Sequence, residues 1–138
     1  KYFVNNDFSK TFLHGHSFTA NPISCAAAIA SMQIFKKEKT IEKVKLQEKY
    51  HQEGLKLLKL NSKVSHLRQI GGISAFDIMG HKNQYGSKIG NKLRENFLRK
   101  GFIIRPLGNT LYLMPPYCTK KETLENVYLE IDKELKKI

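Results

Sequence analysis

After residue 40 the sequence alternates between helical and strand-like patterns, and this order constrains the fold more than any other feature. Apolar residues recur every three or four positions, as in helices that pack by one face, over about 41–60, 87–100 and 120–135. Patterns typical of strands occupy three short runs: 73–79, 102–105 and 110–114. The last two runs are joined by a short turn, which predicts an antiparallel pair. The fold class is therefore predicted as α+β, a small antiparallel sheet with helices on one face.

The first 39 residues contain no strand pattern of their own. A helix is predicted from Pro22 to about Phe35, because Asn21 can cap it and proline suits its first position. Its Ala-rich apolar stripe would need an outside surface to cover it. The chain is therefore expected to divide into residues 1–39 and residues 40–138.

Local signals refine the helix boundaries in the second part. Thr40 can cap the helix that follows it, and Thr119 with Glu122 has the spacing of a capping box for the last helix. Gly101 is expected to end the helix over 87–100. Gly54 lies inside a helical pattern at a cost of about 1 kcal/mol relative to alanine, which indicates close packing there.

Composition excludes several classes of protein. The chain has 138 residues, 41% of them apolar, and no apolar run approaches the roughly 20 residues needed to span a membrane. No basic and apolar leader pattern opens the chain, so a cytoplasmic location is expected. The two cysteines, Cys25 and Cys118, have no metal-binding spacing and are expected to be free thiols.

The net charge of +12 raises the possibility of nucleic-acid binding. Only four of the 24 basic residues are arginines, and the lysines are spread along the whole chain. Because nucleic-acid readers depend on arginine for bidentate contacts, no nucleic-acid partner is predicted. The alternative would show itself as a steep salt dependence of DNA affinity.

A loop with four chemically useful residues precedes the first helix: His14, Gly15, His16 and Ser17. The two imidazoles could bind a metal, but no third histidine, cysteine or carboxylate has a sequence spacing typical of a metal site, so no metal is predicted. The Ser17 hydroxyl and nearby backbone N–H groups could instead bind a phosphate. A well-packed turn without a ligand is the third interpretation, and composition alone favours it over the phosphate site.

Arg105 follows an apolar run and precedes a turn. Its planar guanidinium suits a fixed carboxylate, because it can bind both oxygens at once. A structural ion pair with an acidic residue of the chain is an equal alternative. Tyr112, in the next strand-like run, is expected to serve in packing rather than as a ligand.

Two motifs resemble known aminotransferases. Residues 14–31, HGHSFTANPISCAAAIAS, resemble the H-G-x-[ST]-[FY]-x-[GA]-N-P-x-x-C-A-A-A segment of class III aminotransferases, which are pyridoxal-phosphate enzymes of fold type I. Residues 105–117, RPLGNTLYLMPPY, are similar to a segment of the adenosylmethionine–8-amino-7-oxononanoate aminotransferases of biotin synthesis. QIGGISAFDI, between the two motifs, resembles a small-domain strand of the family.

The resemblance implies a domain assignment and a reaction. Residues 1–39 would be the end of the large cofactor domain with a connecting helix, and residues 40–138 the C-terminal small domain. The complete enzyme would be a cytoplasmic homodimer that transfers an amino group from S-adenosyl-L-methionine to 8-amino-7-oxononanoate, giving 7,8-diaminopelargonate. The chain would be a C-terminal fragment of it, with small-molecule substrates as its partners.

Roles for individual residues also follow from the resemblance. His16 and Ser17 match the pair that binds the phosphate of pyridoxal 5'-phosphate across the dimer interface. Gly15 matches a residue lining the substrate site, and Arg105 matches the arginine that binds the substrate carboxylate. Tyr112 matches a family tyrosine with no definite role. Ala20 stands where glycine is commoner, a change expected to be tolerated.

One expected residue has no match. None of the 20 lysines has the sequence context of the lysine that forms a Schiff base with the cofactor. No catalytic residue is therefore predicted in this chain, and the chain alone is expected not to transaminate. Two alternatives stay open: another class III aminotransferase, for instance one acting on ω-amino acids, and a non-catalytic remnant or assembly module.

Overall fold

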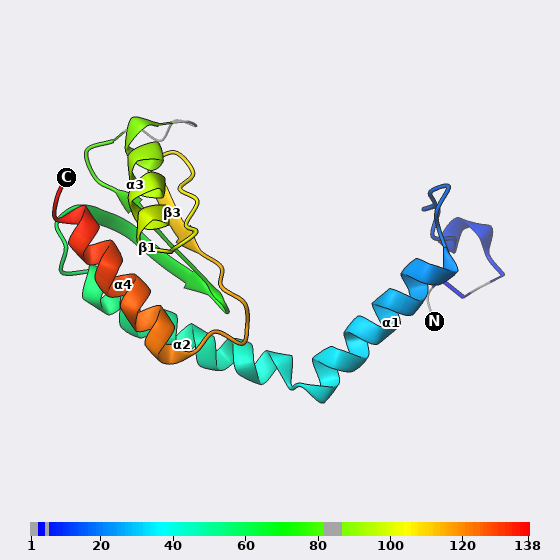
Figure 1. Ribbon diagram of the computed structural model, residues 1–138. Coiled ribbons are helices and arrows are strands. Elements are labelled where there is room, and N and C mark those ends of the chain that lie inside the picture. The colour runs from blue at the N-terminus through cyan, green and yellow to red at the C-terminus, as the bar shows by residue number, and fades with distance from the viewer. Residues whose placement is uncertain (1–2, 5, 82–86) are drawn as a thin grey trace. The chain divides into compact units, whose positions relative to one another are not determined.

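The computed structural model describes residues 3–4, 6–81 and 87–138, and the chain divides into two compact units. The first unit is Lys1–Glu38 and the second is Lys39–Ile138 (Figure 1). The turn-rich sequence of residues 80–86 predicts a loop, and positions 82–86 of it lie outside the described residues.

The first unit consists of a short 3-10 helix, η1 (Phe8–Lys10), a loop, and the helix α1 (Pro22–Lys37). The predicted start of α1 is confirmed, since the Asn21 side chain accepts hydrogen bonds from the backbone N–H groups of Ile23 and Ser24. The helix ends two residues beyond the prediction. None of the residues of α1 is buried within this unit, so its apolar stripe has no core of its own.

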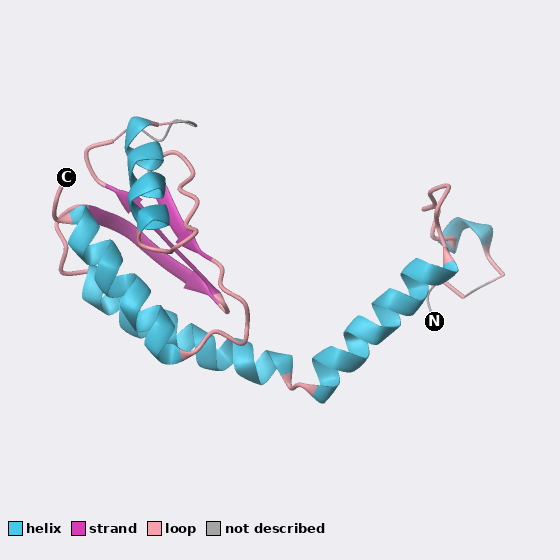
Figure 2. Cartoon of the chain, viewed as in Figure 1, coloured by secondary structure: helices cyan, strands magenta, loops and turns pink. Residues whose placement is uncertain are grey.

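The described residues of the second unit form three helices and a three-stranded sheet, whose arrangement is shown in Figures 1 and 2. Its elements in chain order are α2 (Thr40–Leu58), β1 (Val64–Ile70), β2 (Ile73–Ile78), α3 (Lys88–Arg99), β3 (Thr110–Leu113) and α4 (Lys121–Leu135). The strand order is β1-β2-β3, and both pairs are antiparallel. This arrangement confirms the predicted α+β class.

All three helices cover one face of the sheet. Alternate residues of β2 and β3, such as Phe76 and Leu111, are fully buried, whereas the residues between them are only half-buried. The buried set forms one apolar core with side chains of α2, α3 and α4. Its members are Leu55, Leu58, Phe76, Ile78, Ile89, Leu93, Phe97, Ile104, Leu111, Leu113, Tyr128, Ile131 and Leu135.

The predicted strand membership is partly wrong. Residues 102–105 form no strand, and the one bridge in this region joins Leu107 to Thr110. The partner of β2 on its other side is β1, which the sequence analysis missed. A tight turn at Gly71 and Gly72 places β1 beside β2, and β3 takes the second edge of β2. The pattern of β1 was obscured by a bulge between Ser65 and Arg68, which breaks the alternation of side chains.

Two of the predicted helix caps are also wrong. Thr40 is the first residue of α2 rather than its cap; Lys39, with a positive φ of 50°, precedes it and makes no side-chain capping bond. The residue before α4 is Lys120, again without a side-chain cap. Thr119 lies one position before this cap residue. It belongs to a preceding turn, in which its N–H donates to the Pro116 carbonyl at 3.0 Å.

Helices α2 and α4 pack very closely at Gly54, as predicted. A Cβ at this position would overlap the ring of Tyr128. The Tyr128 hydroxyl lies 2.8 Å from Nδ1 of His51 and 2.7 Å from Oγ of Ser74, and all three side chains are buried. Because Nε2 of His51 faces the Gly72 carbonyl, an obligate acceptor, Nε2 carries the proton and Nδ1 accepts from Tyr128. Burial lowers the pKa of His51 and raises the pKa of Tyr128 to about 12.

Candidate functional site

The second unit has a cavity of about 300 Å³ at the start of α3. Three segments line it: the first two turns of α3, the loop that follows residue 104, and β3. The lining residues are Ser87, Gly90, Asn91, Arg94, Arg105, Pro106, Leu107, Gly108 and Tyr112. The cavity thus contains both residues that the sequence analysis selected from this region, Arg105 and Tyr112.

The loop beside Arg105 is fastened to its neighbours at several points. The Ser87 hydroxyl donates to the Gly108 carbonyl at 2.6 Å and accepts from the N–H of Gly90. A Cβ on Gly90 would come within 2.9 Å of the same carbonyl, so the absent side chain lets α3 approach the loop. Leu107 and Thr110 exchange two backbone hydrogen bonds of 2.8 and 2.9 Å. The backbone around the cavity is therefore held in place by α3 and β3.

Arg105 is exposed to the cavity, and no acidic side chain of the described residues lies within ion-pair distance of its guanidinium. The ion-pair alternative therefore finds no partner in the part of the chain that the structure covers. Tyr112 faces away from the core, opposite Ala75 of β2, and lines the cavity. Its side chain is half-buried, so it has a surface open to a ligand besides its packing contacts.

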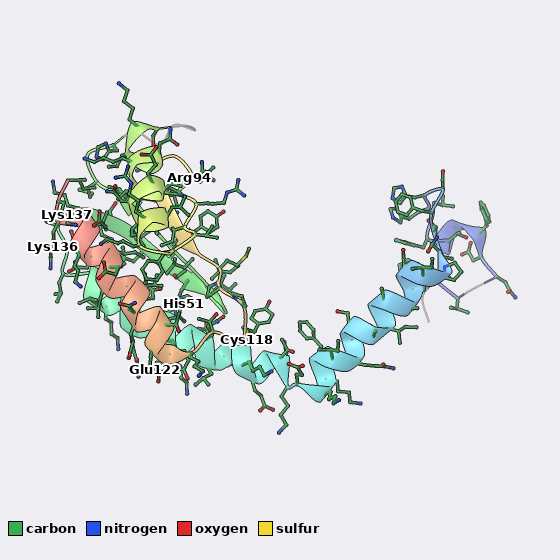
Figure 3. All side chains as sticks on the ribbon, viewed as in Figure 1. His51, Arg94, Cys118, Glu122, Lys136 and Lys137 are labelled. Carbon is green, nitrogen blue, oxygen red and sulfur yellow. The ribbon has the colours of Figure 1, made fainter. Side chains whose placement is uncertain are left out.

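The sequence analysis missed Arg94 as a cavity residue. It lies on α3, four positions after Gly90 and seven after Ser87, so helical periodicity places it on the same face as both. Figure 3 shows Arg94 on α3 and His51 in the layer of α2 and α4. The signal was present in the sequence, but only the contact between α3 and the Arg105 loop gives it meaning.

A second, adjoining cavity of about 360 Å³ shares Arg105 and Tyr112 with the first. Its walls are mostly apolar and come from residues 102–104, the end of β3 and the start of α4. Ile103 and Met114 are among its exposed apolar side chains. A guanidinium therefore stands between a polar cavity and an apolar one.

In the first unit, His16 and Ser17 lie in a tight turn before α1. The N–H of Thr19 donates to the His16 carbonyl at 2.9 Å, and the N–H of His16 donates to the Thr19 hydroxyl at 2.7 Å. Within the described residues, the Ser17 hydroxyl and the N–H groups of Ser17 and Phe18 have no hydrogen-bond partner. A hydroxyl and free N–H groups are suitable donors for an anion.

Aromatic contacts order the side chains of this loop. The His16 ring stacks on Phe18 with 5.3 Å between centroids and meets the edge of His14 at 4.9 Å. No cluster of three metal-ligating side chains occurs among the residues that the structure describes. His14 and His16 thus gain no third ligand from the described part of the chain.

The two small residues of the loop differ in what their backbone requires. A Cβ on Gly15 would meet nothing within 4 Å, so the chain's own packing does not explain a glycine there. Ala20 has a φ of 61°, a left-handed conformation that costs a non-glycine residue roughly 1–2 kcal/mol. A glycine would adopt this conformation without strain, so alanine at position 20 is accommodated at the expense of some stability of the turn relative to glycine.

The chain is similar to known proteins over almost its whole length. A family model described as "Aminotransferase class-III" matches residues 2–135. The chain belongs to the class III aminotransferases. A protein from Synechococcus elongatus named adenosylmethionine-8-amino-7-oxononanoate aminotransferase is 42% identical over 129 residues, which are 94% of this chain and 30% of that protein. A protein of the same name from Helicobacter pylori is 36% identical over 144 residues, covering 99% of this chain and 32% of its own length.

Solved structures agree with this assignment. The adenosylmethionine-8-amino-7-oxononanoate aminotransferase of Methanocaldococcus jannaschii superimposes with a TM-score of 0.78 at 30% identity, covering 94% of this chain and 31% of that one. The chain therefore spans about a third of the length of the relatives it matches. The expected transaminase fold is confirmed.

The expected free thiols are confirmed, since Cys25 and Cys118 are both free and exposed. Among the described residues, no helix is both long and apolar enough to cross a lipid bilayer.

Proposed function

We propose that this chain forms the C-terminal part of an adenosylmethionine–8-amino-7-oxononanoate aminotransferase, which makes 7,8-diaminopelargonate for biotin synthesis. The observation that carries the proposal is Arg105: an unpaired guanidinium lines a polar cavity, in a chain whose relatives bear that name. On this proposal residues 1–39 end the large domain and residues 40–138 form the small domain.

The shape of the site suits this keto acid substrate. Its carboxylate would bind Arg105, since a guanidinium can donate to both oxygens in one plane. The methylene chain that follows the carboxylate would lie against apolar side chains such as Ile103 and Met114, which line the adjoining cavity. Apolar contact would favour a long chain, and the guanidinium would fix its charged end.

Pyridoxal 5'-phosphate is the cofactor of this proposal, because class III aminotransferases are generally dependent on it. The donor set of the turn fits a phosphate: the Ser17 hydroxyl, the free N–H groups of Ser17 and Phe18, and the His16 ring. Bound pyridoxal phosphate supplies an electron sink for the carbanion formed during amino transfer. Gly15, with open space where a Cβ would be, would line the substrate site.

The complete enzyme would be a homodimer in which His16 and Ser17 reach the partner's cofactor. The exposed apolar stripe of α1 supports a covering surface outside the first unit. Two free, exposed thiols are typical of the reducing cytoplasm, where the reaction would take place. Small molecules, rather than nucleic acid or membrane, would be its partners.

Kinetics of an Arg105→Ala variant in the full-length enzyme test the proposal. We expect KM for 8-amino-7-oxononanoate to rise at least about tenfold, since a hydrogen bond to a charged group contributes about 1.5–3 kcal/mol. Arg99→Ala on α3, outside the cavity, is the matched control. An unchanged KM for the keto acid in Arg105→Ala, or no amination of this keto acid by the parent enzyme, contradicts the proposal.

The 138-residue chain alone is expected to show no transamination with added pyridoxal phosphate. The reason is that none of its lysines has the context of the Schiff-base lysine. The measurement is formation of 7,8-diaminopelargonate, with the full-length enzyme as the positive control. Product above the rate without protein would show that the essential lysine lies in this chain after all.

A further inference from the structure

We propose that Arg94 is a second carboxylate-binding residue of the cavity that contains Arg105, and that it selects substrates with an anionic end. The inference rests on the proposed function, because it concerns the same ligand. It adds a residue from a different element, α3, to a site otherwise built from the loop after residue 104 and from β3.

Arg94 and Arg105 line the same cavity, which has a volume of about 300 Å³. Two of its nine lining residues therefore carry a positive charge, and none carries a negative one. A carboxylate bound in this cavity would be attracted by both guanidinium groups.

Neither Arg94 nor Arg105 has a counter-ion in the part of the chain the structure describes. Several other cations of the second unit do form ion pairs, for example Arg68 with Asp77 at 3.0 Å and Lys121 with Glu53 at 3.0 Å. Arg99, on the same helix as Arg94, forms none within those residues, so its place in the cavity wall is what distinguishes Arg94. Two unpaired positive groups at one cavity repel each other. An incoming anion removes this repulsion and gains attraction to both.

The segments that carry the two arginines are fastened to each other. Ser87, at the start of α3, donates to the Gly108 carbonyl at 2.6 Å, and Gly90 packs against the same carbonyl. The helix that carries Arg94 is thus fixed to the loop that begins with Arg105. The backbone positions of Arg94 and Arg105 are therefore fixed relative to each other in the folded chain, before a ligand binds.

The consequence is selectivity for charge rather than for chain length. The apolar cavity beside Tyr112 contacts the methylene chain of the ligand, so it favours long chains. Arg94 interacts only with the charged group at the end of that chain. Removing Arg94 should therefore weaken binding of a carboxylate and leave binding of its neutral amide unchanged.

The experiment is an NMR titration of the ¹⁵N-labelled 138-residue chain with nonanoate and with nonanamide, following the amides of Gly90, Asn91 and Gly108. The variants are Arg94→Gln, Arg105→Gln and the control Arg99→Gln, which lies on α3 outside the cavity. We expect Arg94→Gln to weaken nonanoate binding about fivefold, a typical effect of a partly exposed ion pair, and Arg105→Gln to weaken it more. Arg99→Gln should match the parent chain.

The outcomes separate the two proposals. Weaker nonanoate binding in Arg105→Gln with parental binding in Arg94→Gln overturns the role of Arg94 and leaves the role of Arg105 standing. Equal losses for nonanoate and nonanamide in Arg94→Gln would mean a structural effect and also overturn the inference. The absence of nonanoate-induced shifts at the three amides of the parent chain overturns it too, whatever the kinetics of the Arg105→Ala enzyme show.

Discussion

The two units of the chain use similar helices in opposite ways. In the second unit α2, α3 and α4 bury their apolar faces against one sheet, and Phe97 is fully buried. In the first unit α1 has a well-made cap at Asn21, yet none of its residues is buried within the unit. The difference shows that local signals suffice to form a helix, whereas a core requires segments that are distant in sequence.

The largest effect expected from this contrast is seen by truncating one phenylalanine in each unit. Phe97→Ala should lower the free energy of unfolding by about 3–5 kcal/mol, because it leaves a cavity in the core of the second unit. Phe35→Ala in α1 should lower it clearly less, since that side chain is 43% exposed and belongs to no core cluster of the described residues. Urea unfolding of the 138-residue chain measures both. Similar losses in the two variants would mean that α1 packs on a core in solution.

A smaller effect is expected from adding one methyl group to a glycine of each unit. Gly54→Ala should destabilise the second unit by about 1–3 kcal/mol, because the new Cβ overlaps the ring of Tyr128. His51 and Ser74 hold the Tyr128 hydroxyl, so the ring cannot simply move aside. Gly15→Ala, which meets nothing within 4 Å, is the matched control for unfolding of the chain. A neutral Gly54→Ala would show that α2 and α4 separate at little cost.

The smallest expected effect is on the stability of the fold at acidic pH. Lys100, Lys137 and Asn96 hydrogen-bond to Glu134 and lower its pKa to about 2. A lowered pKa in the folded state adds stability that is complete above the ordinary value of 4.5 and is lost as pH falls from there toward 2.

Glu134→Gln should therefore reduce stability at pH 7 and flatten the decline between pH 4.5 and 2. Urea midpoints across that range measure the effect. Asp7→Asn in the first unit is the comparison, because Asp7 is exposed and accepts mainly from Ser9. A parental pH profile in Glu134→Gln would assign the acid sensitivity to other carboxylates.

The sequence predicted the helices well because their signals are local. The start of α1 at Asn21 and Pro22, and the close packing at Gly54, needed only neighbouring residues and periodicity. The strands were harder to predict, because several segments can compete to pair with the same strand. The tight turn at Gly71 gave β2 a partner in β1, and residues 102–105 were left outside the sheet. The bulge in β1 removed the alternation that would have revealed it.

The site shows the same division. Arg105 was found because it is unusual in its own segment, and His16 and Ser17 because they form a motif. Arg94 looks like any solvent-exposed residue of a helix until α3 is placed against the loop containing Gly108. Helical periodicity groups Arg94 with Ser87 and Gly90, but only the tertiary contact between α3 and this loop shows that the three line a cavity.

The fastening of the Arg105 loop has a consequence for the thermodynamics of binding. Ser87, Gly90 and the Leu107–Thr110 bridge fix the backbone of the cavity during folding. A carboxylate that binds there has to restrict only the side-chain rotamers of the arginines, at about 0.5–1.5 kcal/mol for each side chain, and not a segment of chain. Preorganisation of this kind lets a single charged group at the end of a flexible substrate serve as its anchor.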